Sequence, residues 1–399
     1  MSNSRFIAWA IWVIVSVFYA YQYILRVMPS ILMNDIMQRF NIDAAVFGQF
    51  SGVYYLGYSL MHLPIGIMLD HYGPRKVMTG CILLTIVGML PIIFSEHWTY
   101  PIIGRILIGV GSSAAILGAF KIIRLTFSEA HFSRMLSFSV TIGLIGAIYG
   151  GAPVSYMNKT LGYQAVIEIF AVIGLILAAL TYLIVPEIEK ENSKASVLLE
   201  IKQVLTNKKV ILTCIFAGLM VGPLEGFADV WGAEFFRKVY NFDNNVASSL
   251  PSMIFIGMCF GAPVLSLIAE KTNNYIGTIV FAGIAMAAIF TILIFNKLST
   301  NAISFSFIIV GICCAYQILA IYKASTYVAD NVVGLTTAIA NMIIMIFGYF
   351  FHSIIGMIIK IYSTESSSEA FIYGIGIIPV ALLIGSAGFI TLSYKNRKA

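Results

Sequence analysis

Long apolar runs alternate with short polar segments along almost the whole chain. The runs fall at 7–28, 45–69, 76–95, 100–122, 133–156, 163–185, 210–233, 248–269, 275–295, 302–322, 334–358 and 371–393. A helix crosses a bilayer core about 30 Å thick with roughly 20 apolar residues, and backbone groups in lipid must pair within their own element. The pattern therefore predicts an all-α integral membrane protein with about 12 transmembrane helices.

The longest polar stretch lies between the sixth and seventh runs and is rich in Glu and Lys. It predicts an N-terminal six-helix bundle at 1–185, a cytoplasmic linker at 186–209 and a C-terminal six-helix bundle at 210–399. Within the linker, the spacing of apolar residues suits an amphipathic helix on the membrane surface over 196–205. A solvated linker fits this segment nearly as well.

The charged residues indicate the orientation of the chain in the membrane rather than binding to a charged macromolecule. Only 11% of residues are charged, against about 25% in a soluble domain, which excludes a water-soluble fold. The net charge of +6 is scattered over many loops, so no nucleic-acid partner is expected. Sixteen of the 24 Lys and Arg residues fall in the predicted inner segments and seven in the outer ones. This asymmetry predicts a multi-pass protein of the cell inner membrane with both termini in the cytoplasm.

Several chemistries find no matching motif. All five cysteines lie in apolar runs, outside any CxxC or Cys/His arrangement. HExxH, GxSxG and P-loop patterns do not occur. We therefore expect no metal site, no cofactor and no enzymatic activity, with energy drawn from a gradient or with simple uniport.

A polar signature follows the second run. It reads Gly66-Ile-Met-Leu-Asp70-His-Tyr-Gly73-Pro-Arg75-Lys76, in which Gly66 allows close helix approach, Asp70 ends a helix beside the basic pair and Gly73 permits a tight reversal. The segment resembles motif A of the major facilitator superfamily. The resemblance implies a gating role for these residues, a fold of two pseudo-symmetric six-helix bundles, and alternating-access transport of a small solute.

Two further segments resemble motifs of the same superfamily. Gly104 to Gly111 resembles motif B, and its Arg105 should face the interior cavity or a partner because an unpaired charge in lipid is costly. The run from Gly143 to Pro153 is a partial echo of motif C, which is associated with antiporters. That echo keeps proton-coupled efflux of drugs or siderophores open as an alternative.

The resemblance implies that helices one, four, seven and ten line the substrate path. On the first helix the candidates are spaced three and four residues apart and can share one face, although tyrosines near a helix end also suit an interfacial belt. The candidates on the first, tenth and eleventh helices are Tyr19, Gln22, Tyr23, Arg26, Tyr316, Gln317 and Asn341.

The seventh helix carries two carboxylates, Glu225 and Asp229, beside helix-weakening glycines and Pro223. Counted from Val210, they lie about 22 Å and about 28 Å across the membrane. A carboxylate at the depth of Glu225 needs a cation, a hydrogen-bond partner or a proton, whereas Asp229 could be solvated at the interface. One hypothesis is that Arg26 and Glu225 pair near the outer mouth, where they close a gate or receive a zwitterion.

The segment Tyr21 to Ser30 is similar to the YxYxLRVxPS signature of a bacterial facilitator subgroup. That subgroup is related to phagosomal nutrient transporters of intracellular bacteria and to the lysosomal dipeptide transporter of animals. The resemblance implies uptake of amino acids, short peptides or comparable nutrients. We expect this uptake to be symport coupled to protons. A channel or structural membrane protein is the weaker alternative, since neither requires motif A.

Overall fold

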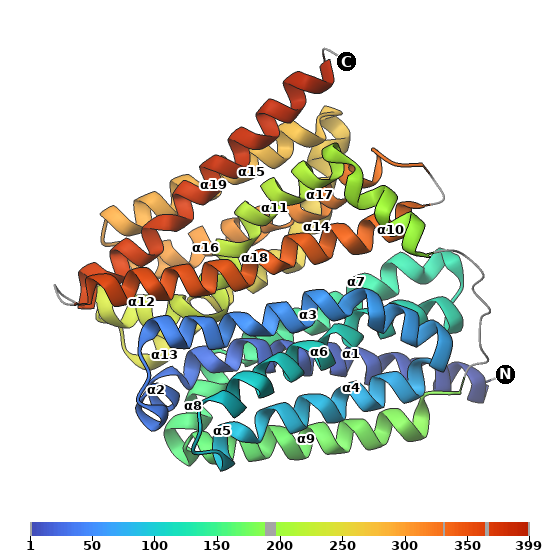
Figure 1. The fold of residues 1–399 in the computed structure, drawn as a ribbon, viewed down its shortest axis with the longest axis horizontal. Helices are drawn as coiled ribbons and strands as arrows, with labels where there is room; N and C mark the ends of the chain where they lie inside the picture. The colour runs from blue at the N-terminus through green and yellow to red at the C-terminus, as the bar shows by residue number, and fades with distance from the viewer. Residues whose placement is uncertain (1, 188–196, 330–331, 364–366, 398–399) are drawn as a thin grey trace. The chain divides into compact units, whose positions relative to one another are not determined.

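A computed structural model describes residues 2–187, 197–329, 332–363 and 367–397. Throughout these ranges the regular elements are helices, which confirms the predicted all-α class (Figure 1). They are α1 (Ser2–Ile31), α2 (Met33–Phe40), α3 (Ala44–Tyr72), α4 (Pro74–Met89), α5 (Pro91–Phe94), α6 (Thr99–Thr126), α7 (Glu129–Tyr149), α8 (Ala152–Leu161), α9 (Tyr163–Ile184), α10 (Val197–Thr206), α11 (Lys208–Gly226), the π-helix η1 (Phe227–Trp231), α12 (Gly232–Val239), α13 (Asn244–Ser249), α14 (Ser252–Thr272), α15 (Tyr275–Phe295), α16 (Thr300–Cys314), α17 (Tyr316–Ser325), α18 (Val333–Tyr362) and α19 (Ser367–Arg397).

Eleven helical segments within the described ranges are long and apolar enough to cross a membrane. The second predicted span, α3, is not among them. It has 29 residues and is about 44 Å long, which exceeds the bilayer core. Its composition is less apolar because Gln49, Ser51, Ser59 and His62 interrupt the run. Length therefore still favours a spanning role for α3.

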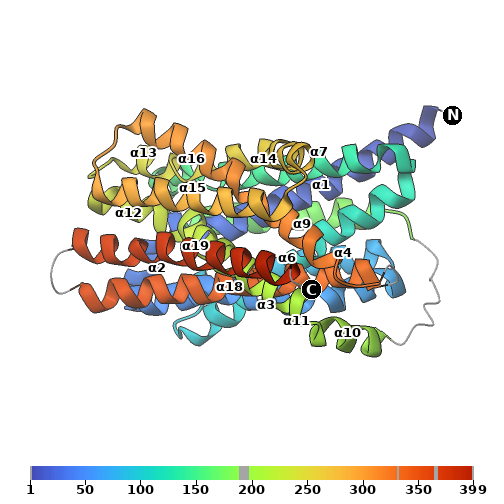
Figure 2. The same cartoon turned by 90° about the horizontal axis from the view of Figure 1, so that it is seen from above.

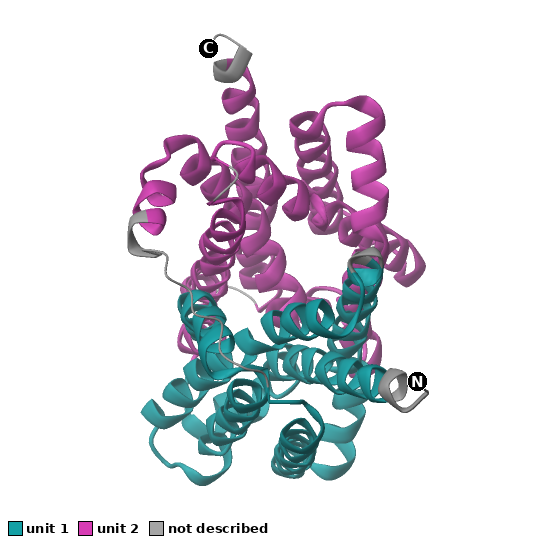
Figure 3. Ribbon diagram, turned by 90° about the vertical axis from the view of Figure 1, so that its right-hand side faces the viewer, with its two compact units in different colours: residues 1–42, 53–193 teal, residues 43–52, 194–399 magenta. Residues whose placement is uncertain are grey.

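The chain forms two compact units, coloured separately in Figure 3. Unit 1 contains residues 1–42 and 53–193, and unit 2 contains 43–52 and 194–399. In unit 1, α4 packs against α6 and α9, and α1 packs against α7. In unit 2, α18 packs against α11 and α19, and Figure 2 shows α18 and α19 side by side. The sequence did not predict that the first turns of α3 belong to unit 2.

Glycine pairs bring helices into close contact at corresponding places in the two units. In unit 1, α3 and α6 cross at Gly57 and Gly109, and a Cβ on Gly109 would lie 2.0 Å from a carbonyl oxygen of α3. In unit 2, α14 and α16 cross at Gly257 and Gly311, and a Cβ on Gly311 would lie 2.0 Å from a carbonyl oxygen of α14. Small residues let membrane helices approach to backbone contact. The second and fourth spans of one unit thus cross as the eighth and tenth spans do in the other.

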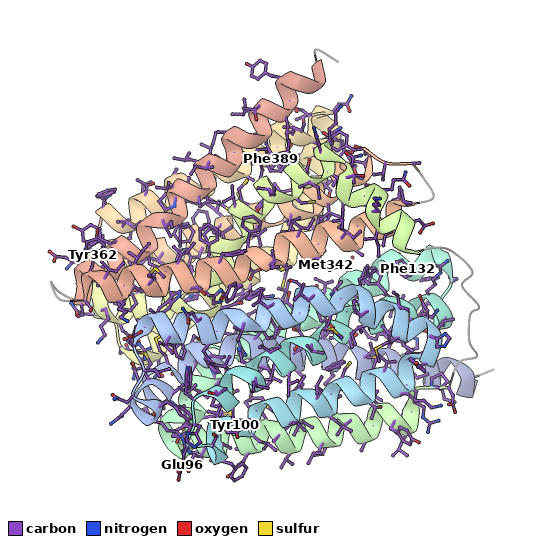
Figure 4. The ribbon with its side chains drawn as sticks, viewed as in Figure 1. Glu96, Tyr100, Phe132, Met342, Tyr362 and Phe389 are labelled. Atoms are coloured by element: carbon purple, nitrogen blue, oxygen red, sulfur yellow. The ribbon has the colours of Figure 1, made fainter. Side chains whose placement is uncertain are left out.

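Figure 4 marks the two ends of unit 1. Glu96 and Tyr100 lie where α5 joins α6, and Phe132 lies near the start of α7 at the opposite end. Trp12, Ile123 and Met135 form a buried apolar cluster near that second end, with Phe132 packed against it. Trp12 Nε1 donates a 2.9 Å hydrogen bond to Ser139 Oγ, which ties α1 to α7. The first helix is therefore anchored well before the polar face described below.

Candidate functional site

The predicted polar face of α1 forms a buried cluster in unit 1. Tyr19, Gln22, Tyr23 and Arg26, whose spacing predicts a shared helical face, are all buried. The Arg26 guanidinium lies 5.1 Å from the ring centre of Tyr23 and 5.1 Å from that of Tyr55. Such contacts stabilise a desolvated cation while leaving its charge in place. The cluster therefore presents a buried positive charge among aromatic rings.

Arg105 of α6 also belongs to this cluster. Its Nη1 donates to Leu25 O at 2.7 Å and its Nη2 donates to Arg26 O at 2.8 Å. Its guanidinium also lies 4.8 Å from the ring centre of Tyr54, whose hydroxyl donates to Gln22 Oε1 at 2.8 Å. The intramembrane arginine thus faces the interior of unit 1, where it bonds the backbone of α1.

An aromatic ladder extends from the cluster along α3. The rings of Tyr54 and Tyr58 stack with centroids 6.0 Å apart, and the His62 ring follows 5.2 Å from Tyr58. His62 is buried and was not among the residues predicted from the sequence. The spacing of four residues was the available signal, because residues four apart lie above one another on a helix.

In unit 2, Glu225 lines a small cavity. The cavity has a volume of about 20 Å³, enough for about one water molecule. Its wall is formed by Val221, Leu224, Glu225, Ala228, Ile254, Phe255, Met258, Cys314, Tyr316 and Gln317. Glu225 is only 8% exposed, so its carboxyl group is held in a mainly apolar environment.

The helical segment that carries Glu225 is longer than the apolar run that predicted it. Through α11, η1 and α12 the candidate span covers 32 residues from Lys208 to Val239. Glu225 is the eighteenth of these residues, and its predicted depth in the bilayer stays a prediction. The amphipathic segment α12 packs against α13 and α19, and its polar residues hid this extension from a hydropathy argument.

Both helices that carry the cavity's polar residues are interrupted beside it. The seventh span becomes a π-helix at Phe227–Trp231, directly after Glu225. The tenth span breaks at Ala315 between α16 and α17, directly before Tyr316 and Gln317. π-helical turns occur frequently at functional sites, and discontinuous helices form the substrate sites of many transporters. The interruptions mark this cavity as the candidate site of unit 2.

The other predicted residues of unit 2 surround these interruptions. Tyr316 is fully buried and its hydroxyl donates to Ala217 O at 2.9 Å, which ties α17 to α11. Gln317 Nε2 donates to Asn341 Oδ1 at 3.3 Å and links α17 to α18. Asp229 lies within η1 and is 1% exposed, so the interpretation of it as a solvated interfacial carboxylate was wrong.

The motif A residues form polar contacts within unit 1. Gly73 adopts φ 81° and separates α3 from α4, as the predicted reversal requires. Asp70 pairs with Lys121 of α6 at 2.9 Å, although the sequence argument placed Asp70 beside the basic pair. No local pattern in the sequence indicates that Lys121 is the partner of Asp70.

The basic pair instead reaches toward the end of α9. Arg75 lies 4.3 Å from the ring centre of Tyr182, and Lys76 forms an ion pair with Glu187. The adjacent Lys76 ammonium lowers the pKa of the Glu187 carboxyl below its usual range. These contacts connect the α3–α4 turn to the segment that leads into the linker.

Two units of long apolar helices, each with buried ionisable groups, define a polytopic helical membrane protein. The sequence matches the family model of the Major Facilitator Superfamily over residues 10–351, and the chain belongs to that superfamily.

Two curated relatives share part of the chain. An uncharacterized transporter of Rickettsia felis is 26% identical over 198 residues, which is 47% of this chain and 47% of that protein. The 3-(3-hydroxy-phenyl)propionate transporter of Escherichia coli K12 is 26% identical over 202 residues, or 48% of this chain and 49% of that protein. The chain thus spans about half the length of the curated relatives it matches.

The fold is shared along nearly the whole chain with a solved structure. A bacterial homologue of the human lysosomal transporter Spinster, in an inward-facing and unoccupied conformation, superposes with a TM-score of 0.77. The match covers 97% of both chains at 15% sequence identity. This similarity confirms the predicted facilitator fold.

The structure therefore assembles most predicted site residues into one cluster in each unit. Unit 1 combines the α1 face with Arg105, and unit 2 combines Glu225 with Tyr316 and Gln317. The suggested pairing of Arg26 with Glu225 stays a prediction, because the two residues belong to different units.

Proposed function

We propose that the chain is a secondary transporter that moves a small polar solute by alternating access. The observation that carries this proposal is the placement of Glu225 in a cavity flanked by two interrupted helices. A carboxylate within a membrane span is costly in a purely structural helix, so its presence favours a role in the transport path. Membership of the superfamily supports the same function.

The two clusters favour a zwitterionic solute such as an amino acid or a dipeptide. Arg26 keeps its positive charge, and a guanidinium group matches a carboxylate with two parallel hydrogen bonds. Glu225 offers the complementary charge for an ammonium group. Gln317 adds an amide at the edge of the same cavity, suited to a peptide or α-amino group.

A gradient of protons is the proposed energy source. A carboxylate within a membrane span needs a cation, a hydrogen-bond partner or a proton, so Glu225 is the proposed carrier of the coupling proton. Binding of an ammonium group would then release that proton, which couples the two events. We further propose that the protein lies in the inner membrane with both termini in the cytoplasm, as the basic residues predict.

Counterflow in proteoliposomes tests this function. Purified protein is reconstituted with unlabelled amino acids or dipeptides inside, and uptake of the labelled compound is followed with and without a pH gradient. We expect saturable exchange that an inward proton gradient accelerates. If no zwitterion in a broad panel exchanges above protein-free vesicles, the proposed substrate class is wrong.

A second candidate substrate is an aromatic carboxylic acid. The E. coli relative is named for such a compound, and Leu224, Ile254 and Phe255 give the unit 2 cavity an apolar wall. An aryl-propionate arm in the same counterflow assay separates the candidates, because this solute needs Arg26 but has no ammonium group for Glu225.

A further inference from the structure

The first helix contains a backbone acceptor that its own hydrogen bonds cannot satisfy. Pro29 lies inside α1, and a proline has no N–H to offer the carbonyl four residues earlier. That carbonyl belongs to Leu25, which is fully buried. An unsatisfied carbonyl in a buried site is costly, so the helix needs a donor from elsewhere at this position.

Arg105 supplies that donor from α6. Its Nη1 donates to Leu25 O at 2.7 Å, and its Nη2 donates to the next carbonyl, Arg26 O, at 2.8 Å. Both distances are those of charge-assisted hydrogen bonds, and Arg105 itself is 2% exposed. The planar fork of a guanidinium group fits two adjacent carbonyls in a way that a lysine ammonium cannot.

We propose that Arg105 is a positioning residue that braces α1 at Pro29, where the hydrogen-bond pattern of the continuous helix is broken, and thereby orients Arg26. The brace binds the backbone of Arg26 directly, while the Arg26 side chain lies between the rings of Tyr23 and Tyr55. Arg105 also lies against Tyr54, which holds Gln22 one turn earlier on α1. One side chain therefore contacts both the backbone of Arg26 and the tyrosine that holds its neighbour Gln22.

A double-mutant cycle between Pro29 and Arg105 tests the brace. Pro29→Ala restores an amide donor for Leu25 O, so the full chain should then depend less on Arg105. In detergent-purified protein we expect Arg105→Gln to lower the thermal midpoint by about 3 to 6 °C in the native background. In the Pro29→Ala background the same substitution should lower the thermal midpoint by less than half as much. Arg105→Lys keeps the charge but cannot bond both carbonyls, so it should lower the thermal midpoint by an intermediate amount.

Arg39 provides a matched control. It is another arginine of unit 1 that donates to two backbone carbonyls, those of Ile93 and Ser95, away from the Pro29 break. The effects of Arg39→Gln and Pro29→Ala on the thermal midpoint should be additive. If Arg105→Gln costs the same with and without Pro29, or couples to Pro29 no more than Arg39→Gln does, the proposal is wrong. If Arg105→Gln alone gives no folded protein, recovery in the double variant supports the brace and lack of recovery overturns it.

The consequence for solute binding rests on the proposed function. Loss of the brace should raise KM about tenfold or more while kcat changes less, and Pro29→Ala should restore much of the affinity. A direct role of Arg105 in solute or proton binding predicts no such rescue, and that result would overturn the positioning role. The thermal cycle needs no substrate, so it decides on the brace even if every solute fails in counterflow.

Discussion

Replacing Glu225 with glutamine is the sharpest test of the proposed substrate path. The substitution removes the negative charge while keeping the size and shape of the side chain. Because Glu225 is 8% exposed and lines the unit 2 cavity, water can replace little of the lost interaction. Any change in solute affinity therefore reports the charge rather than a change in packing.

The expected magnitude follows from the contact that is lost. A hydrogen bond to a charged group contributes about 1.5 to 3 kcal/mol, and each 1.4 kcal/mol is about a factor of ten in affinity. Glu225→Gln should therefore raise KM for an amino acid or dipeptide by roughly 10- to 150-fold. It should also abolish the acceleration of uptake by a proton gradient, since an amide cannot carry the proton.

The assay is counterflow in proteoliposomes over a range of substrate concentrations, with size-exclusion chromatography to verify that each variant is folded. Glu168→Gln is the matched control, because Glu168 is an exposed carboxylate on α9. The reasoning is refuted if Glu225→Gln changes KM by less than about twofold and keeps its pH dependence. Equal losses in the Glu168 control would also refute it.

Two further predictions concern stability. Gly109→Ala places a methyl group 2.0 Å from Tyr54 O and should destabilise unit 1 by at least about 1 to 3 kcal/mol, seen as a lower thermal midpoint. Gly80→Ala is its control, since nothing lies within 4 Å of that Cβ and no loss is expected. Equal effects of the two would contradict the close helix crossing. Lys360 lies 2.8 Å from Asp43 and lowers the pKa of that carboxyl group. The ion pair therefore stabilises the folded protein above pH of about 3.9, and this stabilisation is lost as the pH falls through the lowered pKa. Lys360→Gln should cost less than about 1 kcal/mol at pH 7, because both groups are largely exposed, and the difference from the native chain should vanish in acid. A loss that persists unchanged at pH 2 to 3 would contradict this assignment.

The helical class and the family could be predicted from the sequence because both depend on local patterns. In a bilayer each spanning segment must satisfy its own backbone, so apolar run length alone indicates a helix. The segment from Gly66 to Lys76, at the junction of α3 and α4, identified the superfamily. Helical spacing predicted a shared face for Tyr19, Gln22, Tyr23 and Arg26 for the same reason.

Hydropathy alone could not predict the lengths of the irregular helices. The helical segment of the seventh span continues through polar α12, and that segment packs against α13 and α19. Asp229 lies in η1, between α11 and α12, and is buried there. The π-helix that contains it carries no sequence signal that we could identify.

The sequence by itself thus determined what is local: the all-α membrane class, the facilitator signature and the polar face of α1. Only the tertiary structure decided which distant groups meet. It paired Asp70 with Lys121 and placed Arg105 on the carbonyl of Leu25. Helix formation depends on neighbours a few residues away, whereas such contacts depend on how helices far apart in the chain pack together.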